Sequence, residues 1–100
     1  MRIVVAGTFR VPPDNLPGLR PHMNAIVAAT RAEEGCEVYS YGEDVVEPGL
    51  FRVFEIWRDQ ACVDAHMQSA HMKAWQEARA AAGLYDRDIK LYAVSGEQQL

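Results

Sequence analysis

The segment LFRVFEIW, residues 50–57, constrains the fold more than any other part of the chain. Most of its residues are aromatic or β-branched, which favours an extended strand. Because side chains alternate between the two faces of a strand, residues 51, 53, 55 and 57 share one face and the other four share the opposite face. Apart from Arg52 and Glu55, all of these side chains are apolar. The sheet that contains this strand must therefore be covered on both faces.

Patterns in the rest of the chain predict the order of strands and helices. Further strands are expected at residues 1–11, 36–44 and 89–95, one helix mostly after Pro21 with a stop at Gly35, and a second helix from a cap at Asp59 to about Ala82. The order β-α-β-β-α-β predicts an α+β, ferredoxin-like fold with an antiparallel sheet. Both helices then cover the same sheet face, and residues 1–100 form a single domain.

The sheet face opposite the helices has no cover in this fold. At the N-terminus, Ile3 and Val5 alternate with Val4 and Ala6, so this strand is also apolar on both sides. Such a face is larger than a monomer normally exposes. We therefore expect a homodimer that packs through the sheet faces, with a cavity between each sheet and its own helices.

Charge and cysteine content exclude several classes of protein. The net charge is −4, and lysines and arginines are interleaved with acids, so the basic patch of a nucleic-acid binder is missing. The two cysteines form no C-x-x-C motif and predict neither a disulfide scaffold nor a structural zinc site. The apolar run at residues 3–6 is too short for a signal peptide or a membrane span. We expect a cytoplasmic protein with no nucleic-acid and no membrane partner.

Two histidines stand five positions apart in HMQSAHMKAW, residues 66–75. On one continuous helix, His66 and His71 would lie at opposite edges of an apolar, alanine-rich stripe. Helical metal pairs normally sit four positions apart, and this spacing therefore predicts no metal site. Small side chains along the stripe leave room for a pocket beside the sheet. Its expected lining is Val53, Trp57, Met67, Ala70 and Trp75.

Glu55 stands among apolar residues on its strand face. If that face is buried, the carboxylate must find a partner or stay protonated. His66 or His71 of the following helix is a natural partner, and an imidazole oriented by a carboxylate is a suitable general base at neutral pH. The alternative is a structural hydrogen bond between Glu55 and a histidine or an arginine, and the residues alone leave both open.

Three motifs of the chain resemble those of the antibiotic biosynthesis monooxygenase family, and the similarity spans nearly the whole chain. The motifs are E-P-G-C-x-x-Y at Glu33 to Cys36 with Tyr39, E-x-W at Glu55 and Trp57, and H-x-x-S-x-H at His66, Ser69 and His71. Glu34 stands where the family has proline. In the family's aromatic-polyketide monooxygenases a pocket asparagine and a tyrosine correspond to Val53 and Val63, which departs from their detailed scheme.

This resemblance implies a dimeric α+β barrel whose members include oxygenases without metal, flavin or heme. Such enzymes oxidise electron-rich quinols, anthrones or polyphenols, because the deprotonated substrate itself supplies electrons to O2. It implies a cofactor-independent monooxygenase, an oxidoreductase that takes a small aromatic substrate and O2, with His66, His71 and Glu55 as catalytic residues and Trp57 as a pocket wall. The positions of the tryptophan and histidine of a heme-degrading branch fall on His66 and Gln76, so no heme is expected. Other relatives are small-metabolite isomerases or ligand-binding proteins, which is the alternative function.

Overall fold

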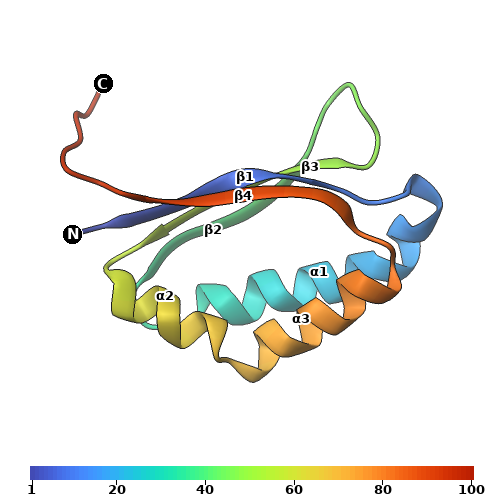
Figure 1. Cartoon of the computed structure of the whole chain (residues 1–100), viewed down its shortest axis with the longest axis horizontal. Coiled ribbons are helices and arrows are strands. Elements are labelled where there is room, and N and C mark those ends of the chain that lie inside the picture. The colour runs from blue at the N-terminus through green and yellow to red at the C-terminus, as the bar shows by residue number, and fades with distance from the viewer.

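A computed structural model describes all 100 residues. The elements are β1 (Ile3–Arg10), a 3-10 turn η1 (Pro13–Asn15), α1 (Leu16–Arg31), β2 (Cys36–Glu43), β3 (Leu50–Trp57), α2 (Gln60–Met67), α3 (Ala70–Ala81) and β4 (Tyr85–Ala93). Figure 1 shows two layers, with the sheet on one side and all helices on the other. The expected α+β, ferredoxin-like architecture is confirmed. None of the helices has the length and apolar character that crossing a membrane requires.

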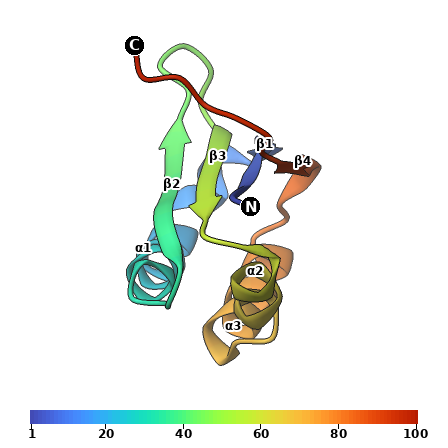
Figure 2. The same ribbon diagram turned by 90° about the vertical axis from the view of Figure 1, so that its left-hand side faces the viewer.

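The four strands form one antiparallel sheet in the order β2-β3-β1-β4. Figure 2 shows α1 below the β2 side of this sheet and α2 with α3 below the β4 side. In the register, Glu55 of β3 lies between Val5 of β1 and Tyr39 of β2. Side chains directly opposite each other in an antiparallel pair share a face. All three side chains therefore point toward the helices.

Two groups of buried side chains form the core beneath the sheet. The larger cluster lies between strands β1 and β3 on one side and helices α1 and α3 on the other. In it, the Phe9 and Phe51 rings stack with centroids 5.3 Å apart, and Trp75 of α3 belongs to the same cluster. The second, smaller cluster lies between the sheet and α2 and includes Tyr39 and Trp57. Each of these aromatic side chains is almost completely buried, and burial of one aromatic side chain stabilises the fold by roughly 1.5–3 kcal/mol.

Helix α1 starts earlier than the prolines suggest. We expected regular helix mostly after Pro21, but the helix begins at Leu16 and continues through Pro21. Pro17 lies in the first turn, where a missing N–H costs little. Leu19 and Met23 are buried on either side of Pro21, and their burial against the sheet offsets the lost hydrogen bond.

Strand β4 also starts earlier than expected, at Tyr85 rather than Ile89. It pairs only with β1, so one edge and much of its surface stay in solvent and polar residues are tolerated there. Asp86 has a positive φ of 50°, and the register with β1 shifts between Thr8 and Arg10. This bulge interrupts the alternating pattern from which the strand was predicted.

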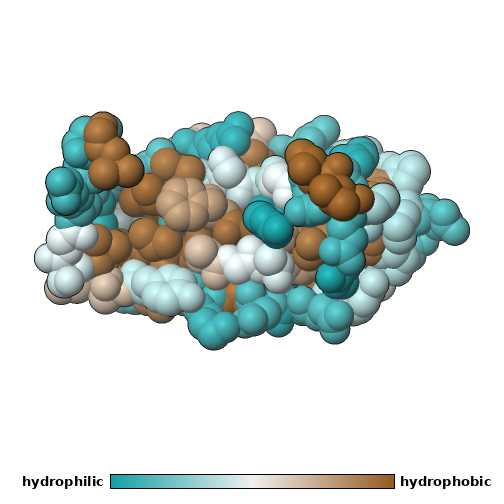
Figure 3. Space-filling model, turned by 90° about the horizontal axis from the view of Figure 1, so that it is seen from above, coloured by the Kyte–Doolittle hydropathy of each residue, from teal (hydrophilic) through white to brown (hydrophobic).

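The sheet face away from the helices is largely apolar in its central part. Its apolar side chains, read from the strand register, are Val4, Ala6, Val38, Phe54, Ile56 and Tyr92. Figure 3 looks onto this face and shows a hydrophobic area bordered by hydrophilic residues. Phe54 is 45% exposed there, and Tyr92 is 51% exposed.

Candidate active site

The second helix of the sequence prediction is two helices. Helix α2 ends at Met67 and α3 begins at Ala70. Ser69 caps α3, because its hydroxyl accepts a hydrogen bond from the Met72 amide at 3.2 Å and donates one to the His66 carbonyl at 2.7 Å. The assumption of a continuous helix was therefore wrong, and with it the placement of the two histidines at opposite edges of one stripe.

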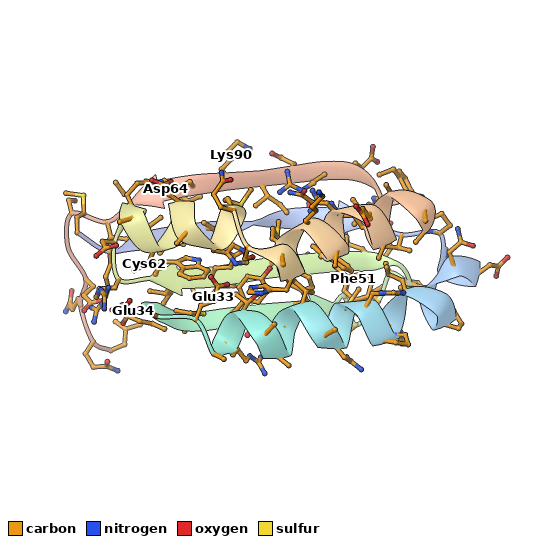
Figure 4. The ribbon with its side chains drawn as sticks, turned by 90° about the horizontal axis from the view of Figure 1, so that it is seen from below. Glu33, Glu34, Phe51, Cys62, Asp64 and Lys90 are labelled. Atoms are coloured by element: carbon orange, nitrogen blue, oxygen red, sulfur yellow. The ribbon has the colours of Figure 1, made fainter.

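The break brings both histidines to one carboxylate, that of Glu33. His66 Nδ1 donates to Glu33 Oε2 at 2.6 Å, and His71 Nε2 donates to the same oxygen at 2.9 Å. Glu33 lies in the loop after α1, and Figure 4 shows it between α1 and α2. Three segments that are distant in the sequence thus converge on one side-chain cluster.

Gly35 allows the loop of Glu33 to lie against α2. Its φ is +78°, a conformation that costs non-glycine residues free energy. A Cβ atom at this position would lie 2.3 Å from Cys62 Sγ. The loop is also bound to the residues just before α2, because the Arg58 amide donates to the Gly35 carbonyl at 2.8 Å. Glycine is therefore needed here to place Glu33 beside the histidines.

His66 joins this cluster to an internal cavity between the sheet and the helices. The residue is only 2% exposed, and its ring lies 4.9 Å from the Trp57 ring and 5.5 Å from the Tyr39 ring, centroid to centroid. It also lines a cavity of about 60 Å³. Because Glu33 engages Nδ1, the nitrogen that remains available to a molecule in the cavity is Nε2.

Glu55 lines the same cavity and makes a different contact from the one expected. Its Oε1 accepts a hydrogen bond from Trp57 Nε1 at 2.9 Å, and neither histidine bonds to it. Burial raises the pKa of Glu55 to about 7. The proposed Glu55–histidine pair was therefore wrong, because the acid that reaches the imidazoles comes from the loop after α1 rather than from β3.

The other polar groups at the cavity are two tyrosines and two arginines. The hydroxyls of Tyr39 and Tyr41 lie 2.8 Å apart. Burial raises the pKa of Tyr39, and it raises the pKa of Tyr41 to about 12, so both hydroxyls keep their protons at neutral pH. Burial and the neighbouring Arg87 lower the pKa of Arg79. Arg79 and Arg87 both line the cavity, and neither forms an ion pair within the chain.

The structure distributes the residues expected in the pocket over three places. Val53, Met67 and Trp75 line the cavity. Trp57 is fully buried and does not line it, so it supports Glu55 from behind instead of forming a wall. Ala70 is exposed and lies outside the lining, because the new helix starts there with a changed direction.

His71 also lies outside the cavity lining, with its side chain 30% exposed on the far side of Glu33.

No role was predicted from the sequence for Glu33, Tyr41, Arg79 or Arg87. The family-like motif at residues 33–36 contained the signal for Glu33, and strand alternation places Tyr41 on the same face as Tyr39.

Comparisons with known proteins agree with this fold and these motifs. The family model "Antibiotic biosynthesis monooxygenase" matches residues 2–78. "Uncharacterized protein sll1783" of Synechocystis is 33% identical over 98 residues, which cover 98% of this chain and 67% of that protein. "Putative monooxygenase YcnE" of Bacillus subtilis is 30% identical over 73 residues, which cover 73% of this chain and 77% of that protein.

A solved structure gives the same result for the fold. The crystal structure of a protein from Deinococcus radiodurans, described as a "putative antibiotic biosynthesis monooxygenase", superposes with a TM-score of 0.88 at 25% identity and covers 100% of this chain and 98% of its own. Fold, motifs and family match together define the class of this protein. The chain belongs to the antibiotic biosynthesis monooxygenase family.

Proposed function

We propose that this protein is a cofactor-independent monooxygenase that oxidises an electron-rich quinol, anthrone or polyphenol with O2. The observation that carries the proposal is the Glu33–His66 pair, which leaves one imidazole nitrogen to serve a cavity in a chain of this family. For an anthrone, the reaction converts a ring CH2 to C=O. One atom of O2 enters the product, and the other leaves as water with the two hydrogens.

His66 is the proposed base. A carboxylate that accepts from Nδ1–H fixes the neutral ring in the tautomer whose lone pair is on Nε2. Nε2 then removes a proton from the substrate, and the resulting anion is reducing enough to pass an electron to O2. Glu33 is a positioning residue in this scheme, and His71 holds the same carboxylate oxygen from the other side.

Groups on the cavity can stabilise the anion that this step creates. The Tyr39–Tyr41 hydroxyl pair can donate one hydrogen bond into the cavity. The Arg79 and Arg87 side chains bring positive charge to the same lining. Prearranged donors and charges of this kind lower the free energy of a developing oxyanion.

The size of the cavity sets a condition on substrate entry. A volume of about 60 Å³ holds O2 or a few water molecules, whereas pockets for drug-sized ligands measure about 300–1,000 Å³. An aromatic substrate therefore requires α2 and α3 to move away from the sheet. Their junction at Gln68 and Ser69 is the natural hinge, and the flexible side chains of Met67 and Met72 lie at the cavity next to it.

Oxygen uptake tests the proposal directly. Protein treated with a chelator is incubated with a panel of hydroquinones and anthrones, and O2 consumption is followed with an electrode while products are identified by mass spectrometry. His66→Asn keeps an amide donor near the Nδ1 position and removes the base atom. We expect turnover to fall by about 10²- to 10⁴-fold, the usual contribution of a general base.

The matched control is His22→Ala, since His22 is exposed on α1 and should be dispensable. Substrate-dependent O2 consumption that is equal in His66→Asn and the wild type would refute the assignment of the base. Uptake no higher than background across the whole panel would refute the oxygenase function.

A second candidate is a small-metabolite isomerase, which the small cavity favours. His66 and Glu55 both line it, and two proton-exchanging groups on one cavity suit the transfer of a proton between neighbouring carbon atoms. Incorporation of solvent deuterium into a bound hydroxycarbonyl compound, without O2 uptake, would favour this function.

A further inference from the structure

We propose that Glu33, His66 and His71 form a binding site for a divalent first-row transition-metal ion, with Zn²⁺ as its simplest occupant. Each of the three residues offers one ligand atom, and these atoms all lie within 4.8 Å of one another. Glu33 Oε2 lies 2.6 Å from His66 Nδ1 and 2.9 Å from His71 Nε2. Donors of a tetrahedral Zn²⁺ site are about 3.3 Å apart, given metal–ligand distances of about 2.0–2.1 Å. Small side-chain movements therefore suffice to admit an ion between them.

The backbone already fixes the positions from which these donors come. His66 lies in the last turn of α2 and His71 in the first turn of α3, and the Ser69 cap holds the break between them. Gly35 and the Arg58–Gly35 backbone hydrogen bond hold the loop that carries Glu33. The site is thus assembled from three separately anchored segments, which limits the entropy that ion binding would cost.

The donor set and its exposure fit a metal with open coordination positions. Two imidazoles and a carboxylate are a common set for Zn²⁺ and also for mononuclear Fe²⁺ centres. Zn²⁺ is the redox-inert probe for this class. The side chains of His71 and Glu33 are 30% and 16% exposed, so an ion can enter from solvent without passing through the cavity. Water can fill the remaining coordination positions.

Metal binding would have a defined effect on His66, and this consequence rests on the proposed function. When the neutral ring donates Nδ1–H to the Glu33 carboxylate, the lone pair is on Nε2. A metal ion on Nδ1 requires the lone pair there, so a neutral ring must move its proton to Nε2. The nitrogen that serves the cavity then becomes a donor and cannot act as a base. Zn²⁺ therefore inhibits the proposed oxygenase reaction without entering the cavity.

Calorimetric titration of the chelator-treated protein with Zn²⁺ tests the site without any substrate. We expect saturable binding of one ion per chain. His71→Gln retains an amide donor near the Nε2 position but is a poor metal ligand. It should weaken binding by at least about 100-fold, because loss of even an outer-sphere partner costs about 10- to 100-fold.

His22→Ala serves as the matched histidine control and should bind Zn²⁺ like the wild type. Circular dichroism checks that each variant is folded, and the visible spectrum of Co²⁺ bound to the wild type reports nitrogen and oxygen ligation without any substitution. Equal Zn²⁺ affinity in the wild type and His71→Gln would place the ion elsewhere, for example on the thiols of Cys36 and Cys62, and overturn the proposal. So would the absence of saturable binding.

Nitrogen-15 NMR of the imidazoles provides a readout that is independent of activity. We expect His66 to change from the Nδ1–H to the Nε2–H tautomer when Zn²⁺ is added, and an unchanged tautomer would overturn the assignment of Nδ1 as ligand. If Zn²⁺ binds and switches the tautomer but no substrate supports O2 uptake, the metal site stands and the oxygenase function falls.

Discussion

Glu55 shows how one buried acid couples the site to the stability of the fold. The residue is 7% exposed, and its carboxylate accepts one hydrogen bond, from Trp57 Nε1. The ionised form is therefore poorly solvated, and burial raises the pKa from 4.5 to about 7. Between these two pH values the folded state holds a proton that the unfolded state releases. The contribution of Glu55 to the free energy of unfolding is consequently greatest below pH 4.5. It falls as the pH rises from there through 7.

Glu55→Gln should remove this contribution. Each pKa unit corresponds to about 1.4 kcal/mol, so the variant should gain up to about 3 kcal/mol in unfolding free energy over the wild type at pH 8 and almost nothing at pH 4. Urea denaturation at both pH values measures the difference. Glu77→Gln, at an exposed position on α3, is the control. A difference between Glu55→Gln and the wild type that does not vary with pH would contradict the raised pKa.

The burial of Glu55 could be predicted from sequence, whereas the acid that binds the two histidines could not. Strand alternation alone placed it among apolar side chains. The choice of the hydrogen-bond partner depends on where loops and helices end in space, and Glu33 lies far from His66 in the sequence. A pairwise contact across that separation leaves no periodic pattern in either segment.

At the level of elements, the break between α2 and α3 was not predicted, because one continuous helix was expected there. Both helical segments have good helix formers and a shared apolar pattern, so periodicity suggested one helix. Ser69 is the only cap residue within that stretch that forms a new helix start, and its local hydrogen bonds with Met72 and His66 end one helix and begin the other. The capping residue Ser69 was the sequence signal for the break, and the helical periodicity of the surrounding segment made it easy to miss.

Gly35 is the element-level position where a single methyl group should matter most. We expect Gly35→Ala to lower the unfolding free energy by about 1–2 kcal/mol from its left-handed backbone conformation alone, and further because the new Cβ meets Cys62. Thermal and urea denaturation measure this change.

Gly18→Ala is the matched control, because Gly18 lies in α1 with nothing within 4 Å of a new Cβ. It should stabilise the protein by up to about 1 kcal/mol, since alanine is a better helix former. If Gly35→Ala were as stable as Gly18→Ala, the loop would not need a left-handed backbone conformation at residue 35.

For the whole molecule, the order of strands and helices was enough to predict the sheet. Crossover rules leave few ways to arrange β-α-β-β-α-β, and the observed order β2-β3-β1-β4 is the ferredoxin-like one. The size of the cavity could not be predicted, because it depends on how closely side chains such as Trp75 and Met72 fill the space beneath the sheet.

We propose that the apolar outer face of the sheet is the contact surface of a homodimer. Phe54 lies near the middle of this face, between Ala6 and Ser40 of the neighbouring strands, with no helix over it. A second copy of the same face would cover it, and the helix-side cavity of each chain would stay separate. The proposal rests on the apolar character of the face and on its lack of cover within the chain.

Phe54→Lys should convert a dimer into a monomer, because a charge at the centre of an apolar contact loses its solvation. Light scattering coupled to size-exclusion chromatography measures the mass in solution. Ala25→Lys introduces the same charge on the exposed side of α1 and should leave the mass unchanged. A wild type with the mass of one chain, or a Phe54→Lys variant with the mass of two, would be incompatible with this contact.

The central position of β1 has a consequence for how the chain folds. The first of the four strands in chain order lies inside the sheet, and its partners are β3 and β4, the last of the four, with Ile3 opposite Ala93. Closing such long loops is entropically costly and slows folding compared with local pairings such as the β2–β3 hairpin. On the ribosome, β1 must therefore stay unpaired at both edges until β3 has been synthesised, and at one edge until β4 follows. An apolar strand held open in this way is a natural substrate for chaperones that bind extended segments.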